Sequence, residues 1–207
     1  SIEQGDVPRQ AKGDRYVNRG ILFINVVDVV STGISWVNCK RIINSHYKRI
    51  QRAEPTIGDL IFVRSGKGSI GKSTVFAGIP GEDKFGISGH LNTVRLNNIN
   101  AFYVEVFLKS FYGQLQIERF ESGTSQQTDF RQESFAAIKI PLLKETIQSH
   151  IETGYKKMSV YHDKAMEAKA EGNEAKYKKN IETAEAMLKE LIAKTEAVIR
   201  GEREDVV

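Results

Sequence analysis

Hydrophobic and polar residues follow two different patterns along this 207-residue chain, and the change falls near Pro141. Before Pro141, short runs rich in β-branched and aromatic residues alternate with Gly, Asn and Ser, which is typical of an irregular mixed sheet. The predicted strands are 21–30, 60–64, 74–77, 91–96 and 136–140. Residues 101–111 show neither a clean alternation nor a narrow helical stripe, and we interpret them as a short helix packed on the sheet.

After Pro141 the chain is rich in Ala, Glu, Lys, Leu and Ile, and apolar positions recur every three or four residues, which predicts long helices. A first stripe consists of Ile147, Ile151, Tyr155, Met158, His162, Ala165 and Ala168. A second and more regular stripe consists of Tyr177, Ile181, Ala184, Leu188, Leu191, Thr195 and Val198. Between them, Gly172 and Asn173 suit a helix end. Two helices of about 26 residues could form an antiparallel hairpin, and a single bent helix is the alternative.

The second stripe requires a partner helix, because the rest of the chain is too small to bury it alone. That helix could come from the same chain or from another one, and we expect a homodimer formed through the helices. The residues expected to face the partner helix are Ile181, Leu188, Leu191, Ile192 and Val198. The fold class predicted is α+β, with a mixed, β-rich domain at 1–142, long coiled-coil-type helices at 143–201 and a tail at 202–207.

Composition and charge narrow the class of protein. No apolar run approaches the roughly 18 residues of a membrane span and no signal peptide heads the chain, so no membrane association is expected. A single cysteine excludes a disulfide framework and suits a cytoplasmic setting. The net charge of +4 is uneven, because residues 1–143 carry +5 and residues 144–207 carry −1. A polyanion partner and an ordinary solvated basic surface explain this asymmetry equally well.

A glycine- and lysine-rich loop follows the predicted strand 60–64. Its sequence from Gly66 to Ser73 fits the pattern of a nucleotide phosphate loop, Gly, four residues, Gly-Lys-Ser. Such a loop opens into a helix whose amides hold the phosphates. Here the next residues are β-branched or aromatic, and Gly78 and Pro80 follow before a helical turn could form. A nucleotide-hydrolysing protein is therefore disfavoured, and a strand-loop-strand that presents Lys67 and Lys72 to a polymer backbone is preferred.

Candidate catalytic groups are sparse. The four histidines lack metal-ligand spacing, no dinucleotide-binding glycine loop is present, and the Asn/Asp-Pro-Pro-aromatic tetrad of amino-methylating enzymes does not occur. We expect neither a catalytic residue nor a metal site, and interpret the chain as a non-enzymatic component.

Five blocks of the sequence, in order, resemble the target recognition domain of the specificity (S) subunits of type I restriction-modification systems, and of their relatives fused to adenine methyltransferases. The blocks are Gly5-Asp6-Val7-Pro8-Arg9, 20–29 (GILFINVVDV), 58–64 (GDLIFVR) with 68–72 (GSIGK), 122–126 (SGTSQ) and 138–142 (IKIPL). In that family, the last block leads into a long helix. Full S subunits resemble two such domains with two helical spacers, whereas this chain has one of each. It could be a half-sized S subunit or the recognition region of a single-chain type IIG restriction-methyltransferase.

The resemblance implies a function in sequence-specific DNA recognition at a bipartite site. Loop side chains would read base edges in the major groove, while Lys and Arg contact phosphate. The candidate DNA-binding residues are Arg9, Lys12 and Arg15 in the first loop, Arg64, Lys67, Ser69 and Lys72 around the glycine loop, and Ser122, Thr124, Ser125 and Gln126. Arg64 is the first choice for a base contact, because a guanidinium can pair bidentately with guanine.

The same resemblance implies partners. They are double-stranded DNA, an adenine-N6 methyltransferase (M) subunit and, in some systems, a restriction (R) subunit. S-adenosylmethionine and ATP would bind those partner subunits, so this chain would hold no cofactor. A structural adaptor that uses the helices for assembly and does not bind DNA remains the alternative from another class of protein.

Overall fold

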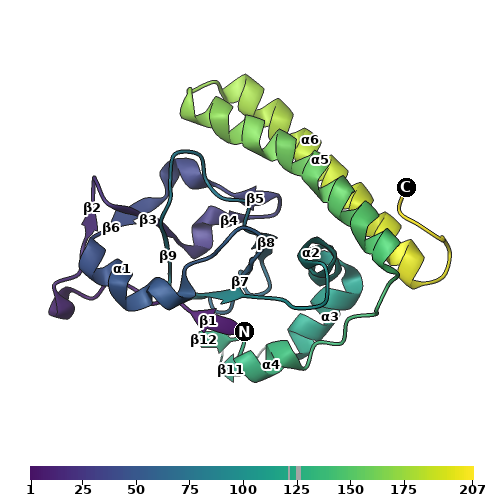
Figure 1. Ribbon diagram of the computed structural model, residues 1–207, viewed down its shortest axis with the longest axis horizontal. Helices are drawn as coiled ribbons and strands as arrows, with labels where there is room; N and C mark the ends of the chain where they lie inside the picture. The colour runs from purple at the N-terminus through teal and green to yellow at the C-terminus, as the bar shows by residue number, and fades with distance from the viewer. Residues whose placement is uncertain (121, 125–126) are drawn as a thin grey trace.

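The computed structural model describes residues 1–120, 122–124 and 127–207, which form a β-rich part followed by two long helices (Figure 1). The first sheet of this described part has the strand order β1-β10-β7-β8, all neighbours antiparallel. Its strands are β1 (Ile2–Gln4), β10 (Leu91–Val94), β7 (Leu60–Val63) and β8 (Ser73–Val75). The second sheet has the order β2-β6-β3-β9, with β3 and β9 parallel. Its strands are β2 (Tyr16–Val17), β6 (Lys40–Ile42), β3 (Ile21–Ile24) and β9 (Phe85–Ile87).

Two small hairpins accompany the sheets. One pairs β4 (Val29–Val30) with β5 (Gly33–Ile34), and the other pairs β11 (Ser122–Thr124) with β12 (Gln127–Asp129). Short helical segments complete the β-rich part: η1 (Gln10–Lys12), η2 (Val26–Asp28), η3 (Trp36–Asn38), α1 (Asn44–Ile50), η4 (Gln51–Ala53) and α4 (Gln132–Ala136). A core of aliphatic and aromatic side chains from both sheets joins them, including Ile24, Ile61, Val63, Ile87 and Leu91.

Helix α2 (Ala101–Lys109) lies at the centre of the molecule, between the first sheet and the long helices (Figure 1). The Asn100 side chain caps it by accepting hydrogen bonds from the amides of the first turn. Val104 and Leu108 pack against the sheet, while Tyr103 and Phe107 pack against the long helices. A helix covered on both sides is apolar all round, which is why this segment shows no narrow stripe in the sequence. The predicted short helix is confirmed.

The two long helices, α5 (Glu145–Ala170) and α6 (Glu174–Ile199), are each 26 residues long and form the antiparallel hairpin of Figure 1. Asn173 caps α6, and Gly172 takes the left-handed conformation (φ +71°) that the turn requires. All seven residues of the first predicted stripe are buried. Of the two predicted arrangements, the hairpin is therefore the one observed.

The partner helix of the second stripe is thus α5 of the same chain. Leu188, Leu191 and Val198 are buried in a cluster shared with α5 and α2, and Ile181 and Ile192 are half-buried. Leu188, Leu191 and Val198 therefore face a partner helix as expected, and of its two expected sources the same chain supplies it. A second copy would have to contact other faces.

The α+β fold class is confirmed, but several predicted elements differ. The predicted strand 136–140 is wrong: it begins at the last residue of α4 and continues in irregular chain. The predicted strand 21–30 is interrupted by η2, because Asn25 and Asp28 cap each other's backbone and divert the chain into a helical turn. Helix α3 (Phe111–Phe120) was not predicted. Helix α3 follows α2 directly. Gly113 lets the backbone of α3 lie close to the end of α2, since a Cβ at this position would lie 2.2 Å from the Phe107 carbonyl oxygen.

Candidate nucleic-acid interface

The glycine loop connects two antiparallel neighbours, β7 and β8, and no helix follows it. Gly66, Gly68 and Gly71 have φ values of 121°, 70° and 84°, a conformation that other residues rarely adopt. The Gly71 amide donates to the Val63 carbonyl (3.1 Å), so the loop closes as a turn of the sheet. The predicted strand-loop-strand is confirmed: a strand, and not the helix that a nucleotide phosphate loop opens into, follows the glycine loop.

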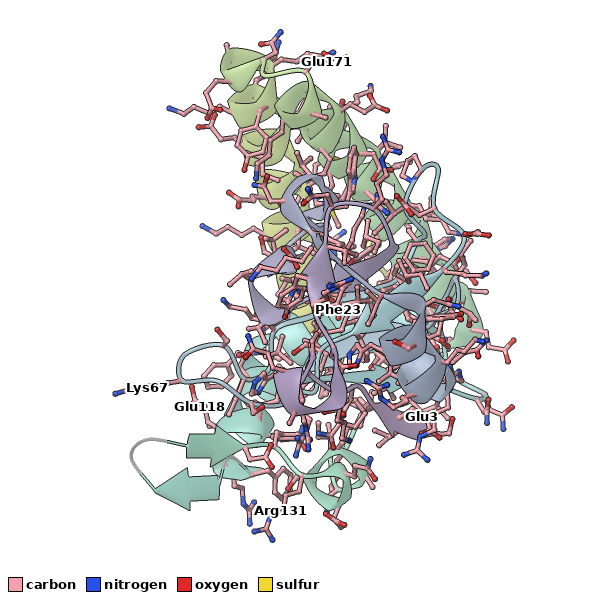
Figure 2. All side chains as sticks on the ribbon, turned by 90° about the vertical axis from the view of Figure 1, so that its left-hand side faces the viewer. Glu3, Phe23, Lys67, Glu118, Arg131 and Glu171 are labelled. Carbon is pink, nitrogen blue, oxygen red and sulfur yellow. The ribbon has the colours of Figure 1, made fainter. Side chains whose placement is uncertain are left out.

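Lys67 lies at the tip of this loop and projects away from the body of the protein, on the side where the β11–β12 hairpin lies (Figure 2). It makes no ion pair with any residue that the structure describes. Lys72, at the other end of the loop, is also exposed, and its ammonium lies 3.4 Å from the Ser69 hydroxyl. Both lysines are therefore available to a phosphate backbone.

Arg64 occupies a different position, at the base of the loop where β7 ends. One of its terminal nitrogens donates to the Asp129 carboxylate (2.6 Å), and the other lies 3.4 Å from the Gly89 carbonyl oxygen. Its side chain is only 18% exposed. The Phe130 amide also donates to the Arg64 carbonyl (2.6 Å), so the chain after the β11–β12 hairpin is tied to the end of β7. Arg64 is thus held in place before any ligand arrives.

The first loop, residues 5–15, brings further basic residues to the surface. Asp14 anchors it: the buried carboxylate binds the Arg49 guanidinium and lies 3.3 Å from His46. The hydrogen bond from Arg49 holds the pKa of Asp14 at about 2. Arg9 pairs with Asp6 (3.1 Å), whereas Lys12 and Arg15 are exposed and form no ion pair within the described part of the chain.

These two loops meet in a cleft of about 480 Å³. The structure therefore brings Arg9 of the first loop together with Arg64 and Lys67, which lie more than 50 positions later in the sequence. Sequence reasoning missed the residues that complete the cleft, namely Gln4, Asp6, Ser65, His90 and Asp129. The Ser65 hydroxyl and His90 Nδ1 lie 2.8 Å apart. We call this the recognition cleft. Lys12, Arg15, Ser69 and Lys72 lie outside its lining.

The remaining candidates lie in the β11–β12 hairpin. Ser122 and Thr124 belong to β11, and the bridge between Ser65 and Asp129 places the end of this hairpin beside the glycine loop. Ser125 and Gln126 lie outside the described residues.

A second set of polar side chains is buried where the β-rich part packs against the helices. His162 of α5 is held by Thr32, whose hydroxyl lies 2.8 Å from Nδ1, and by the Ile34 carbonyl, which lies 3.1 Å from Nε2. Burial lowers the pKa of His162, so the ring is neutral, donates from Nε2 and accepts at Nδ1. Thr74 of β8 contacts the Tyr155 hydroxyl (3.3 Å), and burial raises the pKa of Tyr155.

Glu105 and Lys109 of α2 add a buried ion pair (3.0 Å), and Lys109 also donates to the Ser73 carbonyl (2.8 Å). The glutamate is fully buried and the lysine nearly so. We call the contacts made by Thr32, Thr74, Glu105, Lys109, Tyr155 and His162 the polar seam. It fixes the β-rich part on the helices.

Among the described residues, no group of three or more His, Cys, Asp or Glu side chains could hold a metal ion. None of the helices in that part of the chain is both long and apolar enough to cross a membrane.

No family model matches the sequence, and no curated protein matches it. Among solved structures, the chain is similar to the crystal structure of a type I restriction-modification system S subunit from M. genitalium, with 15% sequence identity and a TM-score of 0.49. The match covers 82% of this chain and 38% of that one, so this chain spans well under half the length of that S subunit. At this level of similarity, the function has to be inferred from the residues of the chain itself.

Proposed function

We propose that this chain is the DNA-recognition component of a restriction-modification system, which directs an adenine-N6 methyltransferase to a bipartite site. The observation that carries the proposal is the recognition cleft. Arg9 and Arg64 belong to separate blocks of the family resemblance, Lys67 lies between the segments 58–64 and 68–72, and all three residues line the cleft. A cleft lined by arginine, lysine, histidine, glutamine and serine offers many hydrogen-bond donors to base edges and phosphates.

The residues of the cleft divide by exposure. Lys67 extends from the surface (Figure 2) and would contact phosphate, which sets the position of the protein without reading sequence. Arg64 also lines the cleft, but its side chain is only 18% exposed and is held by Asp129. A guanidinium in a fixed orientation can donate two parallel hydrogen bonds to guanine O6 and N7, so Arg64 would read a base.

The helical hairpin would serve as spacer and assembly element. A bipartite site requires two recognition domains, and a second copy of this chain or a second domain would supply the other half. The methyltransferase subunit, with S-adenosylmethionine, and in some systems a restriction subunit driven by ATP, would perform the chemistry. This chain would supply only the DNA sequence specificity.

The test is genomic methylation mapping by single-molecule sequencing in cells that carry the partner methyltransferase, with and without this chain. We expect a bipartite adenine motif that depends on the chain, and a symmetric motif would indicate two copies. If the motif persists without the chain, or if no methylated motif depends on the chain, the DNA-recognition function is rejected. The chain is then interpreted as a structural adaptor.

Arg64→Ala tests the assignment of the base contact. We expect it to lower affinity for the selected site by about 10- to 100-fold, the range of one good bidentate pair, and to relax the motif at one position. Binding to random duplex DNA should change much less. Equal losses on both kinds of DNA would remove Arg64 from the base-reading residues.

A further inference from the structure

Both arginines of the recognition cleft are paired with a carboxylate of the same cleft, whereas its lysine is not. Arg64 pairs with Asp129 (2.6 Å), and Arg9 pairs with Asp6 (3.1 Å). The two carboxylates come from opposite ends of the domain sequence, one in the first loop and one at the end of β12. In a surface meant only to attract DNA, acidic side chains beside the basic ones would weaken binding.

A carboxylate at this position affects two kinds of ligand differently. A phosphate group that approaches Arg64 brings its negative charge toward Asp129 and is repelled. The edge of guanine carries no net charge, so its O6 and N7 atoms can accept hydrogen bonds from the guanidinium without this repulsion. Only part of the guanidinium is engaged by Asp129 and Gly89, which leaves other N–H groups for a base.

The geometry also shows how Asp129 can act through Arg64. Both residues line the cleft, and the arginine side chain is more buried than the aspartate, with exposures of 18% and 40%. The hydrogen bond from Phe130 to the Arg64 carbonyl and the Ser65–Asp129 bridge fix the backbone on both sides of the pair. Asp129 is therefore positioned to hold the guanidinium in one orientation. Asp6 is fixed in a similar way, because its carboxylate also accepts from the Val7 amide (2.9 Å).

We propose that Asp129 and Asp6 are specificity-determining residues, which orient Arg64 and Arg9 and keep phosphate away from them, so that these arginines bind base edges only. This inference rests on the proposed function. It assigns non-specific attraction to Lys67 and discrimination to the two acid–arginine pairs. As a consequence, removing the carboxylate of Asp129 or of Asp6 strengthens binding to DNA that lacks the target sequence.

The experiment uses the full chain and two readouts. The first is affinity for a fluorescently labelled pool of random-sequence duplexes, measured by anisotropy over a range of salt. The second is the motif enriched from a randomised duplex library, prepared with guanine or with 7-deazaguanine, which lacks the N7 acceptor. The variants are Asp129→Asn and Asp6→Asn. The matched control is Asp83→Asn, which removes the same charge at an exposed position outside the cleft.

We expect Asp129→Asn to bind the random pool about threefold more tightly at low salt, because a like charge no longer opposes phosphate. Its enriched motif should lose one guanine, the position that 7-deazaguanine also erases for the wild-type chain. Asp6→Asn should bind the pool more tightly and relax a different position. In an Arg64→Ala background, Asp129→Asn should cause no further change in the motif, since the aspartate acts through the arginine.

The outcomes separate this inference from the proposed function. If the wild-type chain binds no duplex in a salt-dependent manner and enriches no motif, the proposed function fails. If it enriches a motif, but both acid variants return that motif and bind the pool no more tightly than Asp83→Asn, the inference alone is overturned. Thermal melting shows whether each variant is folded, and Asp6→Asn decides the matter if Asp129→Asn does not fold.

Discussion

The polar seam and the recognition cleft use similar residues for opposite purposes. Each contains an acid–base ion pair and a histidine that contacts a hydroxyl, namely Glu105–Lys109 and His162–Thr32 in the seam and Arg64–Asp129 and His90–Ser65 in the cleft. In the seam these groups are buried, so losing one partner leaves the other unpaired in a medium of low dielectric constant. In the cleft they reach solvent, so water or a ligand can replace a partner. Exposure, rather than residue type, separates the structural site from the proposed binding site.

The strongest way to test this difference is to break the buried ion pair. Lys109→Met should lower the free energy of unfolding by about 3–5 kcal/mol, because it leaves the fully buried Glu105 carboxylate without its cation. Chemical denaturation followed by circular dichroism measures the change. The matched control is Lys178→Met, which breaks an exposed pair with Glu182 on α6 and should cost under about 0.5 kcal/mol. Equal costs for the two variants would refute the contrast.

The next effect concerns the contact between the β4–β5 hairpin and α5. A Cβ at Gly33 would lie 2.6 Å from His162 Nε2, so Gly33→Ala should displace the ring and destabilise the protein by about 1–3 kcal/mol. The same substitution in a His162→Ala background should cost clearly less, because the space is then empty. A double-mutant cycle by chemical denaturation measures the coupling energy between positions 33 and 162. Additive losses in the free energy of unfolding would show that the Gly33→Ala side chain does not clash with His162.

The pH dependence of stability sharpens the comparison further. The lowered pKa of His162, caused mainly by burial and partly opposed by the Ile34 carbonyl and by Asp163, means that the unfolded chain binds a proton more readily than the folded one. The free energy of unfolding should therefore fall as the pH drops below about 6.5, the ordinary pKa of histidine. His162→Gln should reduce that slope in melts between about pH 8 and pH 5. His90→Gln, in the cleft, serves as the control, and an equal reduction by both variants would contradict the assignment.

The smallest effect is expected from the loop tip. Lys67→Ala should leave the free energy of unfolding unchanged within about 0.5 kcal/mol, since the side chain projects from the surface (Figure 2). It should weaken binding to random and selected duplexes alike, and reduce the slope of log affinity against log salt by about one. Lys178→Ala on α6 should leave the slope unchanged. A loss restricted to the selected duplex would make Lys67 a base reader instead.

The sequence predicted the helices better than the strands, for a physical reason. The stripe from Ile147 to Ala168 repeats often enough to identify a long helix and the face that it buries. Strands here have two to four residues, too few for a period to be read, and local capping decides where they stop. Asn25 and Asp28 end β3 in this way. In the run 136–140, Ile138 and Ile140 are apolar because they pack beside α2 and the sheet, although the run is not a strand.

The candidate site was predictable in part. Arg9, Arg64 and Lys67 were found from their loops and from the family resemblance, and the structure places them around one cleft. Asp129 could not be found, because its relation to Arg64 spans 65 positions of the chain and depends on how the β11–β12 hairpin folds back. Arg64 was already the first choice for a base contact, and the structure adds its ion pair with Asp129 and its low exposure.

The burial of α2 on both sides has a consequence for how this protein can evolve. Val104 packs against the sheet and Tyr103 packs against the long helices, so close packing limits which substitutions this helix accepts during evolution. The loops that form the recognition cleft contribute little to that core, and substitutions there leave the central helix untouched. Under the proposed function, new DNA specificities would arise by exchange of loop residues while the packed core stays unchanged.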